Sequence, residues 1–308
     1  MKLPIIFGPT AVGKTELAAK LAEYLPIEVI SMDSRQVYKY MDIGTGKPSK
    51  QIRAIVPHHL VDFLDPHQGY NAYLFRKDAQ RLVKEILTRE KVPLIVGGTG
   101  LYADALLFGI LERVPANDGL RRALLNLDRS FPGVLRRILE KTDPVSAERI
   151  HPNDIKRIVR AIEVRITAGK RISDLWKEQR GDTSESSFYV VLLERERKDL
   201  YGRINERVFQ MFKNGLIDEV KRLLQMGYSP ELDALKTIGY KEVVGYLENK
   251  YSLNETIKLV QKHTRHYARR QIMWSRRYKE AFRFNLSDIT TKRVAEEIVR
   301  VIKSHLGG

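Results

Sequence analysis

The segment at residues 8–15 has the residue types and spacing of a phosphate-binding loop. It reads Gly-Pro-Thr-Ala-Val-Gly-Lys-Thr and matches the pattern G-x-x-x-x-G-K-[ST] in full. An apolar run precedes it and a helical pattern follows it, which is the context that this motif requires. Backbone amides would point at phosphate oxygens, Lys14 would add a positive charge, and the Thr15 hydroxyl would ligate Mg²⁺. The sequence therefore predicts a phosphate site that also binds magnesium.

A carboxylate follows the next predicted strand. Asp33 opens the segment Asp-Ser-Arg-Gln-Val-Tyr at 33–38. There it could accept a proton from an attacking hydroxyl, as in a kinase, or from an attacking amine, as in an alkyl transferase. It could also merely cap the next helix. The predicted strand at 93–96 ends in Gly97-Gly98-Thr99-Gly100 and lacks the aspartate that usually helps hold Mg²⁺ in P-loop NTPases, which argues against nucleotide hydrolysis.

Strands that position these groups alternate with helices in the first hundred residues. The apolar patterns predict strands at 3–7, 27–32, 59–63 and 93–96 and helices at 16–25 and 72–90. This alternation is typical of an α/β protein with a P-loop NTPase-like parallel sheet flanked by helices. Because the carboxyl ends of parallel strands meet at one edge, loop 8–13, Asp33 and Gly97-Gly98-Thr99 should converge there.

Residues 115–182 read as helices without strands, and a strand is predicted afterwards at 188–193. The stretch holds 15 Lys+Arg and 10 Asp+Glu, a net charge of +5. The later strand could rejoin the first sheet. We therefore expect an inserted all-helical domain at 115–182, a polar linker at 181–187, and a catalytic core made of 1–114 and 183–308.

The clearest helix of the insertion begins near His151 and ends near Gly169, with Asn153 as the expected N-cap. Five apolar residues share one face: Ile155, Ile158, Val159, Ile162 and Ile166. Three basic residues fall on the opposite face: Lys156, Arg157 and Arg160. That face is either a solvated surface or one that contacts phosphates.

The rest of the chain is mainly helical, with helices predicted at 199–213, 215–226, 239–249, 254–280 and 291–305. The 254–280 helix carries a stripe of basic residues with aromatic residues interleaved: Lys262, Arg265, Arg269 and Arg276, with Tyr267, Trp274 and Tyr278. Such a stripe suits an RNA groove or loop, or else a helix that packs its aromatics and solvates its charges.

The overall charge favours a polyanionic partner. Lys+Arg 54 against Asp+Glu 38 gives +16, and the pI is about 9.8. This excess suggests nucleic acid, although a charge-rich proteome would also produce it. Cys 0 excludes disulfides and thiolate metal sites and fits a reducing cytoplasm. Neither a membrane span nor a signal peptide is expected, because no apolar run nears ~20 residues and a strand is predicted almost at the N-terminus.

Two further features carry weaker signals. His58 and His59 are adjacent on a predicted strand, so they point to opposite faces and should not chelate one ion. Lys47, in Gly44-Thr45-Gly46-Lys47-Pro48, is a basic residue in a glycine-rich loop and by itself only weak support for a second phosphate contact.

Together these segments resemble the bacterial tRNA dimethylallyltransferase family, the isopentenyl-tRNA transferases. Besides the loop at 8–15 and the segment at 33–38, the resemblance rests on stretches spread over the chain. They are Met-Asp-Ile-Gly-Thr-Gly-Lys-Pro at 41–48, Pro-His-His-Leu-Val-Asp at 57–62, Val-Gly-Gly-Thr-Gly-Leu-Tyr at 96–102, the helix of 151–164, Ile-Gly-Tyr-Lys-Glu at 238–242 and Tyr-Ala-Arg-Arg-Gln-Ile-Met-Trp at 267–274.

The resemblance implies transfer of a dimethylallyl group from its diphosphate to N6 of the adenosine 3′-adjacent to the tRNA anticodon. It implies that the helical insertion binds the anticodon stem-loop, that the target base leaves its stack to enter the core, and that the protein is a monomer. Mg²⁺, Lys14 and amide donors would stabilise the departing diphosphate, and Asp33 would accept the N6 proton.

Residue roles follow by position from the same resemblance. Asp33, Thr99 and Arg207 match catalytic positions, with Arg207 as a cationic clamp on diphosphate and Arg203 as the alternative for that role. The diphosphate site comprises Gly8, Pro9, Thr10, Ala11, Val12, Gly13, Lys14 and Thr15, and Thr15 is the magnesium ligand. The tRNA-binding residues are Asp33, Ser34, Arg35 and Gln36 in the core, and Lys156, Arg157, Ile158, Val159 and Arg160 in the insertion.

The chain departs from the family pattern at Met273-Trp274-Ser275-Arg276, where members usually have Thr-Trp-Phe-Arg. This questions any polar contact at 273 but not the transfer chemistry. Two other enzyme classes share the P-loop and the carboxylate. One is an adenine-nucleotide isopentenyltransferase, which would not need the basic surfaces. The other is a P-loop small-molecule kinase, which the missing strand-end aspartate disfavours. A non-catalytic RNA-binding module would leave the P-loop and Asp33 unexplained.

Overall fold

The computed structural model describes residues 2–110, 114, 116–181 and 188–306. The chain divides into two compact units, which we call the core unit, Met1–Leu107 with Ser187–Gly308, and the helical unit, Phe108–Ser186. The boundaries that we expected from the sequence were at 114/115 and 182/183. The predicted linker at 181–187 lies almost wholly outside the described residues.

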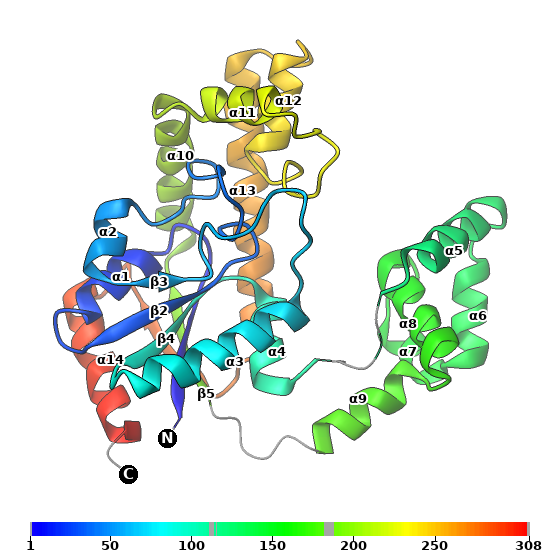
Figure 1. Cartoon of the computed structure of the whole chain (residues 1–308), viewed down its shortest axis with the longest axis horizontal. Coiled ribbons are helices and arrows are strands. Elements are labelled where there is room, and N and C mark those ends of the chain that lie inside the picture. The colour runs from blue at the N-terminus through cyan, green and yellow to red at the C-terminus, as the bar shows by residue number, and fades with distance from the viewer. Residues whose placement is uncertain (1, 111–113, 115, 182–187, 307–308) are drawn as a thin grey trace. The chain divides into compact units, whose positions relative to one another are not determined.

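A six-stranded parallel sheet forms the centre of the core unit, in the order β3-β2-β4-β1-β5-β6 (Figure 1). The strands are β1 (Leu3–Phe7), β2 (Ile27–Met32), β3 (His58–His59), β4 (Val92–Gly97), β5 (Phe188–Glu194) and β6 (Phe282–Asn285). β5 pairs with β1, so the chain does rejoin the first sheet after the helical unit. The predicted α/β fold with a parallel sheet is confirmed.

Strands β1, β2 and β4 are buried along their whole length, which is why they read as nearly continuous apolar runs. The predicted strand at 59–63 was wrong beyond its first residue. Leu60 and Asp62 adopt left-handed backbone angles, φ 58° and 61°, which are incompatible with an extended strand. Strand β6 was not predicted. It pairs only with β5, at the edge of the sheet.

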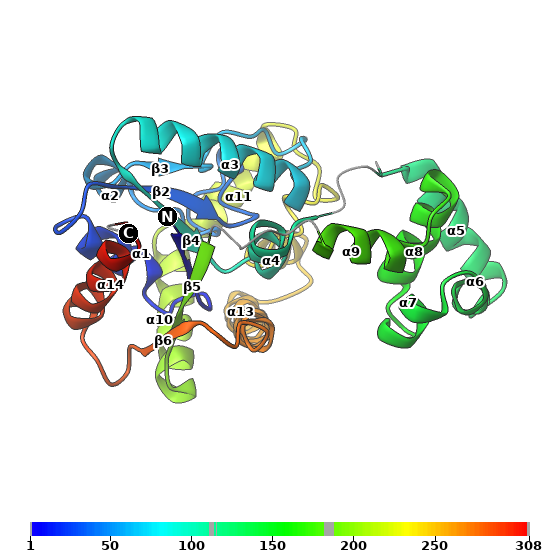
Figure 2. The same ribbon diagram turned by 90° about the horizontal axis from the view of Figure 1, so that it is seen from below.

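Helices cover both faces of the sheet (Figures 1 and 2). One face carries α3 and α4, whose rings Phe75 and Tyr102 stack with centroids 4.4 Å apart. The other carries α1 and α14, with α10 and α13 beside them. The core-unit helices are α1 (Lys14–Leu21), α2 (Lys50–Ile55), α3 (Ala72–Thr88), α4 (Gly100–Phe108), α10 (Arg197–Lys213), α11 (Leu216–Gln225), α12 (Tyr240–Leu247), α13 (Leu253–Ser275) and α14 (Thr291–Leu306).

Helix α13 links the sheet to a second apolar cluster of the core unit, formed by α11, α12 and residues 37–41. It begins at a capping box in which Ser252 and Glu255 bond each other's backbone amides. It ends at Ser275, five residues before the predicted end at 280. No helix in the described part of the chain is long and apolar enough to cross a membrane.

The helical unit contains five helices among its described residues: α5 (Asp118–Ser130), α6 (Val134–Thr142), α7 (Pro144–Arg149), α8 (Ile155–Ala168) and α9 (Ile172–Gly181). The N-cap of α8 is Asp154, whose carboxylate accepts from Arg157 N, so the expected cap Asn153 was wrong by one residue. Gly169 ends the helix at φ 68°, as predicted. Ile166 is 59% exposed and does not belong to the buried face.

Candidate active site

An open cavity of about 1520 Å³ lies at the carboxyl ends of the strands of the core unit. The P-loop and its neighbour helix, the turn after β2, helix α10 and helix α13 all contribute to its wall. The lining includes Lys14, Thr15, Asp33, Arg207, Tyr267 and Gln271. The convergence expected from parallel-strand geometry is therefore present, because β1 and β2 each lie beside β4.

The P-loop joins β1 to α1 with the backbone geometry that an anion cradle needs. Gly13 at φ 117° and Ala11 at φ 64° turn the chain back toward the start of α1. The Lys14 ammonium donates to Gly8 O and Pro9 O, each at 2.8 Å. The N-terminus of α1 borders the cavity, and its first backbone amides have no hydrogen-bond acceptor among the described residues.

The protonation state of Lys14 depends on its burial and on the charged groups around it. Withdrawal of its ammonium group from water lowers the pKa to about 7, although Asp33 raises it and Arg207 lowers it further. A bound anion would replace the two carbonyl oxygens as the partner of the ammonium group. Anion binding should then restore the protonated form.

Asp33 follows β2 and forms a tight turn. Its Oδ1 accepts from Arg35 N at 2.8 Å and from Gln36 N at 3.3 Å. No hydrogen bond from the described residues engages Oδ2, which is free to act as a base. Thr99, after β4, fastens this turn because its Oγ1 accepts from Ser34 N at 3.2 Å. The alternative interpretation, in which Asp33 caps the next helix, is wrong, because that helix, α2, begins only at Lys50. The Oδ1 of Asp33 organises a turn instead.

Two arginines of α10, Arg203 and Arg207, line the cavity, and they differ in whether their charge is paired with a carboxylate. Arg203 donates to Ala11 O at 3.0 Å and pairs with Glu16 Oε1 at 2.9 Å. Arg207 is half-buried and has no ion-pair partner among the described residues, and its Nη2 donates only one long bond, 3.4 Å, to Gly46 O. Burial lowers the pKa of Arg207, while Asp33 raises it. Of the two predicted clamps, Arg207 is thus the one whose charge is not neutralised.

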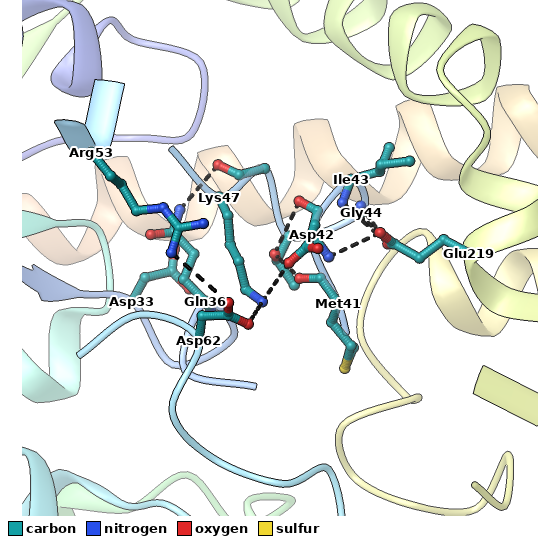
Figure 3. A network of polar contacts seen from close by, with 12 residues as sticks. Asp33, Gln36, Met41, Asp42, Ile43, Gly44, Lys47, Arg53, Asp62 and Glu219 are labelled. Atoms are coloured by element: carbon teal, nitrogen blue, oxygen red, sulfur yellow. Dashed lines mark hydrogen bonds and ion pairs between the residues drawn. The ribbon is translucent and has the colours of Figure 1, made fainter. Parts of the chain in front are cut away.

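A network of polar contacts fixes the loop that contains Gly46, whose carbonyl accepts the hydrogen bond from Arg207 (Figure 3). The buried carboxylate of Glu219, from α11, accepts backbone amides of Asp42, Ile43 and Gly44 at 2.9–3.2 Å. The Tyr240 hydroxyl donates to the same carboxylate at 2.6 Å. These bonds hold the segment 42–44 against α11 and α12, and Gly46 follows two residues later.

Lys47 belongs to this network and not to the phosphate site. The Lys47 side chain is 2% exposed, and its ammonium group pairs with Asp42 at 2.6 Å and with Asp62 at 2.7 Å (Figure 3). The weak expectation of a phosphate contact was therefore wrong. Gln36 donates to Gly46 O at 3.2 Å, so this carbonyl accepts from both Gln36 and Arg207.

Helix α13 brings two residues to the site that the sequence did not single out for the chemistry. Tyr267 lines the cavity; burial raises its pKa, and so does the charge of Asp33. Gln271 is buried and bonds both the P-loop and the loop after β4. Both belong to the stretch Tyr-Ala-Arg-Arg-Gln at 267–271, and Tyr267 was also an aromatic residue of the predicted basic stripe, but their partners lie far away along the chain.

The aromatic part of the predicted α13 stripe is engaged within the protein. Trp274 Nε1 and the Tyr278 hydroxyl both donate to Asp104 Oδ1, at 3.3 and 2.9 Å. A side chain at Gly100 would overlap the Trp274 ring, so the helices α4 and α13 are in direct contact. Tyr278 is buried and Trp274 is half-buried, so both rings serve packing within the core unit. Arg269 and Arg276 remain exposed.

The predicted tRNA-binding segment of α8 divides by burial. Lys156 and Arg157 are exposed, and Arg157 also pairs with Asp154 at 3.3 Å. Ile158 and Val159 are buried in the core of the helical unit, so their side chains cannot touch RNA. Arg160 pairs at 2.6 Å with the fully buried Glu163 and donates to Val114 O. The role predicted for Lys156 and Arg157 stays a prediction.

Metal-binding side chains do not cluster anywhere in the described residues: no group of three His, Asp or Glu could hold an ion. The His58 and His59 rings bond separately, to Val56 O and to the Glu28 carboxylate, each at 2.6 Å. The Thr15 hydroxyl lines the cavity and makes no hydrogen bond within the described residues. It fits an ion that is held mainly by phosphate oxygens.

A P-loop after β1, a carboxylate after β2 and an unpaired arginine on α10 meet in one cavity, and β4 ends in glycines where NTPases carry an aspartate. This fold and site are those of a P-loop transferase.

Comparison with known proteins gives the family. A family model described as IPP transferase matches residues 36–278, and one described as isopentenyl transferase matches residues 1–56. The chain is 53% identical over 302 residues to tRNA dimethylallyltransferase of Thermotoga neapolitana, with 98% of each chain covered. The chain belongs to the IPP transferase family, and the predicted resemblance is confirmed.

Two solved structures also match this chain over nearly its whole length. The tRNA isopentenylpyrophosphate transferase of Bacillus halodurans matches with a TM-score of 0.73 and 37% identity, over 99% of this chain and 97% of that one. A eukaryotic dimethylallyltransferase acting on tRNA matches with a TM-score of 0.85 and 30% identity, over 99% and 80% of the two chains.

Proposed function

We propose that this protein transfers a dimethylallyl group from dimethylallyl diphosphate to N6 of the adenosine 3′-adjacent to the anticodon in tRNA. The family, whose curated relatives carry the name tRNA dimethylallyltransferase, supports the activity. The observation that carries the chemistry is the meeting of the P-loop and Asp33 in one cavity. Diphosphate is the leaving group, and N6-isopentenyladenosine is the other product.

The reaction breaks the bond between the allylic carbon and the diphosphate oxygen and forms a bond from that carbon to N6. Negative charge grows on the diphosphate as it departs. Lys14, the amides at the start of α1 and Arg207 are positioned to stabilise that charge. The free Oδ2 of Asp33 takes the N6 proton, while Thr99 holds the turn that carries Asp33.

Thr15 would hold Mg²⁺ together with diphosphate oxygens, because it carries the hydroxyl of the P-loop motif and makes no hydrogen bond to any residue that the structure describes. The ion would supply additional charge stabilisation to the leaving group. The described residues offer no independent metal site, so we expect magnesium to bind together with the diphosphate.

The tRNA would meet two surfaces. In the core unit, Ser34, Arg35 and Gln36 line the cavity beside Asp33 and are placed to contact a base that enters it. In the helical unit, the exposed Lys156 and Arg157 are suited to phosphates of the anticodon stem-loop. We further propose that the protein acts as a monomer in the cytoplasm, which sedimentation and fractionation would test.

The two competing activities differ from this one in the acceptor and in the donor. An adenine-nucleotide isopentenyltransferase would prenylate AMP, and a kinase would transfer phosphate from ATP. The test is to offer the purified protein AMP or unmodified tRNA together with labelled dimethylallyl diphosphate, and labelled ATP in parallel. Our proposal predicts label in tRNA only. Label in AMP, or phosphoryl transfer from ATP, would refute it.

A further inference from the structure

One buried side chain joins two neighbouring loops at the candidate active site, the P-loop after β1 and the loop after β4. Gln271, on α13, is 5% exposed. Its Oε1 accepts from Thr10 N in the P-loop at 2.8 Å, and its Nε2 donates to Gly98 O after β4 at 2.9 Å. An amide can serve both partners at once, because its oxygen accepts from a backbone N–H while its nitrogen donates to a carbonyl.

The two loops leave the sheet side by side, because β1 and β4 are paired up to Phe7 and Gly97. The described backbone links them through one bond, Gly8 N to Gly97 O, at 3.3 Å. Gln271 fills the space beside Gly98 so closely that a side chain on Gly98 would overlap its Nε2. The pairing of β1 with β4 up to Phe7 and Gly97 sets where the two loops begin, and Gln271 ties the loops together beyond these last paired residues.

These loops carry different reactants. The P-loop leads to Lys14 and Thr15, the proposed diphosphate ligands. Gly98 immediately precedes Thr99, which fastens the turn that bears Asp33. A change in the distance between the loops would move the leaving group relative to the base and the acceptor, while each half-site kept its own hydrogen bonds.

We propose that Gln271 is a positioning residue for prenyl transfer: it holds the diphosphate-binding half of the site in a fixed position relative to the half that holds the acceptor amine. The proposal rests on the proposed function. A displacement of about 1 Å between reacting groups can cost about 100-fold in rate, so the effect should appear in kcat. Binding of either substrate alone should change little.

Other contacts keep α13 in place when Gln271 is changed. Trp274, Arg277 and Tyr278 all bond Asp104 on α4, at 3.3, 2.6 and 2.9 Å. A variant at 271 should therefore fold with the helix docked, although Thr10 N and Gly98 O lose their partner.

The decisive variant is Gln271→Met, which keeps the length of the side chain and removes both hydrogen bonds. Gln271→Glu keeps the acceptor toward Thr10 N and should give an intermediate rate. Gln261→Met is the matched control, since Gln261 lies on the same helix and its amide, within the described part of the chain, bonds only the Asn205 carbonyl, at 3.2 Å. We would measure Tm, kcat for tRNA prenylation, and Kd for pyrophosphate and for tRNA.

For Gln271→Met we expect kcat to fall about 10- to 100-fold, with both Kd values within about twofold of wild type. Gln261→Met should lower Tm and leave kcat unchanged. If wild type is active and Gln271→Met keeps its kcat, or loses pyrophosphate affinity in proportion to kcat, the positioning role is refuted. If wild type transfers no prenyl group, the failure lies in the proposed function.

Discussion

Gly46→Ala tests the position of Arg207 without removing its charge. Gly46 has φ 59°, and a side chain there would overlap the Nη2 of Arg207. The methyl group would push the guanidinium out of its place above the P-loop cavity. Arg207 is the proposed cationic clamp on the leaving group, and losing one preorganised donor typically costs about 100- to 1000-fold in kcat.

Alanine at a left-handed position costs about 1–2 kcal/mol. For a unit of this size that corresponds to a fall in Tm of about 2–8 °C. Gly227→Ala is the matched control, because Gly227 has φ 89° and nothing within 4 Å of the added methyl group. It should lose similar stability and keep its activity.

Single-turnover prenylation of tRNA at saturating substrate, with Tm measured on the same preparations, separates the two effects. Gly46→Ala should lose at least tenfold in rate, and it should lose little more when combined with Arg207→Ala, because both changes remove the same contact. The reasoning is refuted if Gly46→Ala keeps the rate of Gly227→Ala, or if its effect adds fully to that of Arg207→Ala.

Three further outcomes are expected. Asp33→Ala should lower kcat about 100- to 10,000-fold while Kd for pyrophosphate and tRNA stays nearly unchanged, as equilibrium binding would show; a matching loss of affinity would make Asp33 structural. Pyrophosphate binding at pH 8 should take up a proton, because the anion raises the pKa of Lys14 from about 7; calorimetry in buffers of different ionisation enthalpy measures this, and Lys14→Met should abolish it. Arg157→Glu should weaken tRNA binding and reduce the salt dependence of Kd by about one phosphate contact, whereas an unchanged slope would remove α8 from the interface.

Titration of Lys14 also affects stability, with a definite sign. Its pKa is lowered from 10.5 to about 7 in the folded protein, so between these values the unfolded chain binds more protons. The free energy of unfolding should therefore rise with pH across that window. Lys14→Met should flatten this rise in a series of denaturant titrations.

Features that depend on local sequence could be predicted. The P-loop, the buried strands β1, β2 and β4 and the carboxylate after β2 each follow from a continuous motif or apolar run. Their convergence then follows from parallel-strand geometry alone. The end of α8 at Gly169 was predictable for the same reason, since a glycine after an amphipathic run signals a left-handed cap.

Features that depend on partners distant in the sequence could not be predicted. Glu219 and Gln271 act on loops 175 and 173 residues away, and no spacing rule connects a glutamine to a carbonyl at that separation. Strand β6 has only exposed and half-buried residues and gave no apolar run. The left-handed Leu60 and Asp62, which end β3, are residue types whose sequence gives no warning of such angles.

The central claim is that the P-loop binds the diphosphate of an allylic donor and that Asp33 activates an adenosine amine of tRNA. The most direct measurement is incubation of the protein with Mg²⁺, labelled dimethylallyl diphosphate and unmodified tRNA, followed by nucleoside analysis. The account predicts label on N6 of the adenosine next to the anticodon, none with AMP as acceptor, and none in tRNA with Asp33→Ala. Undiminished labelling by Asp33→Ala, or label on AMP in place of tRNA, would contradict it.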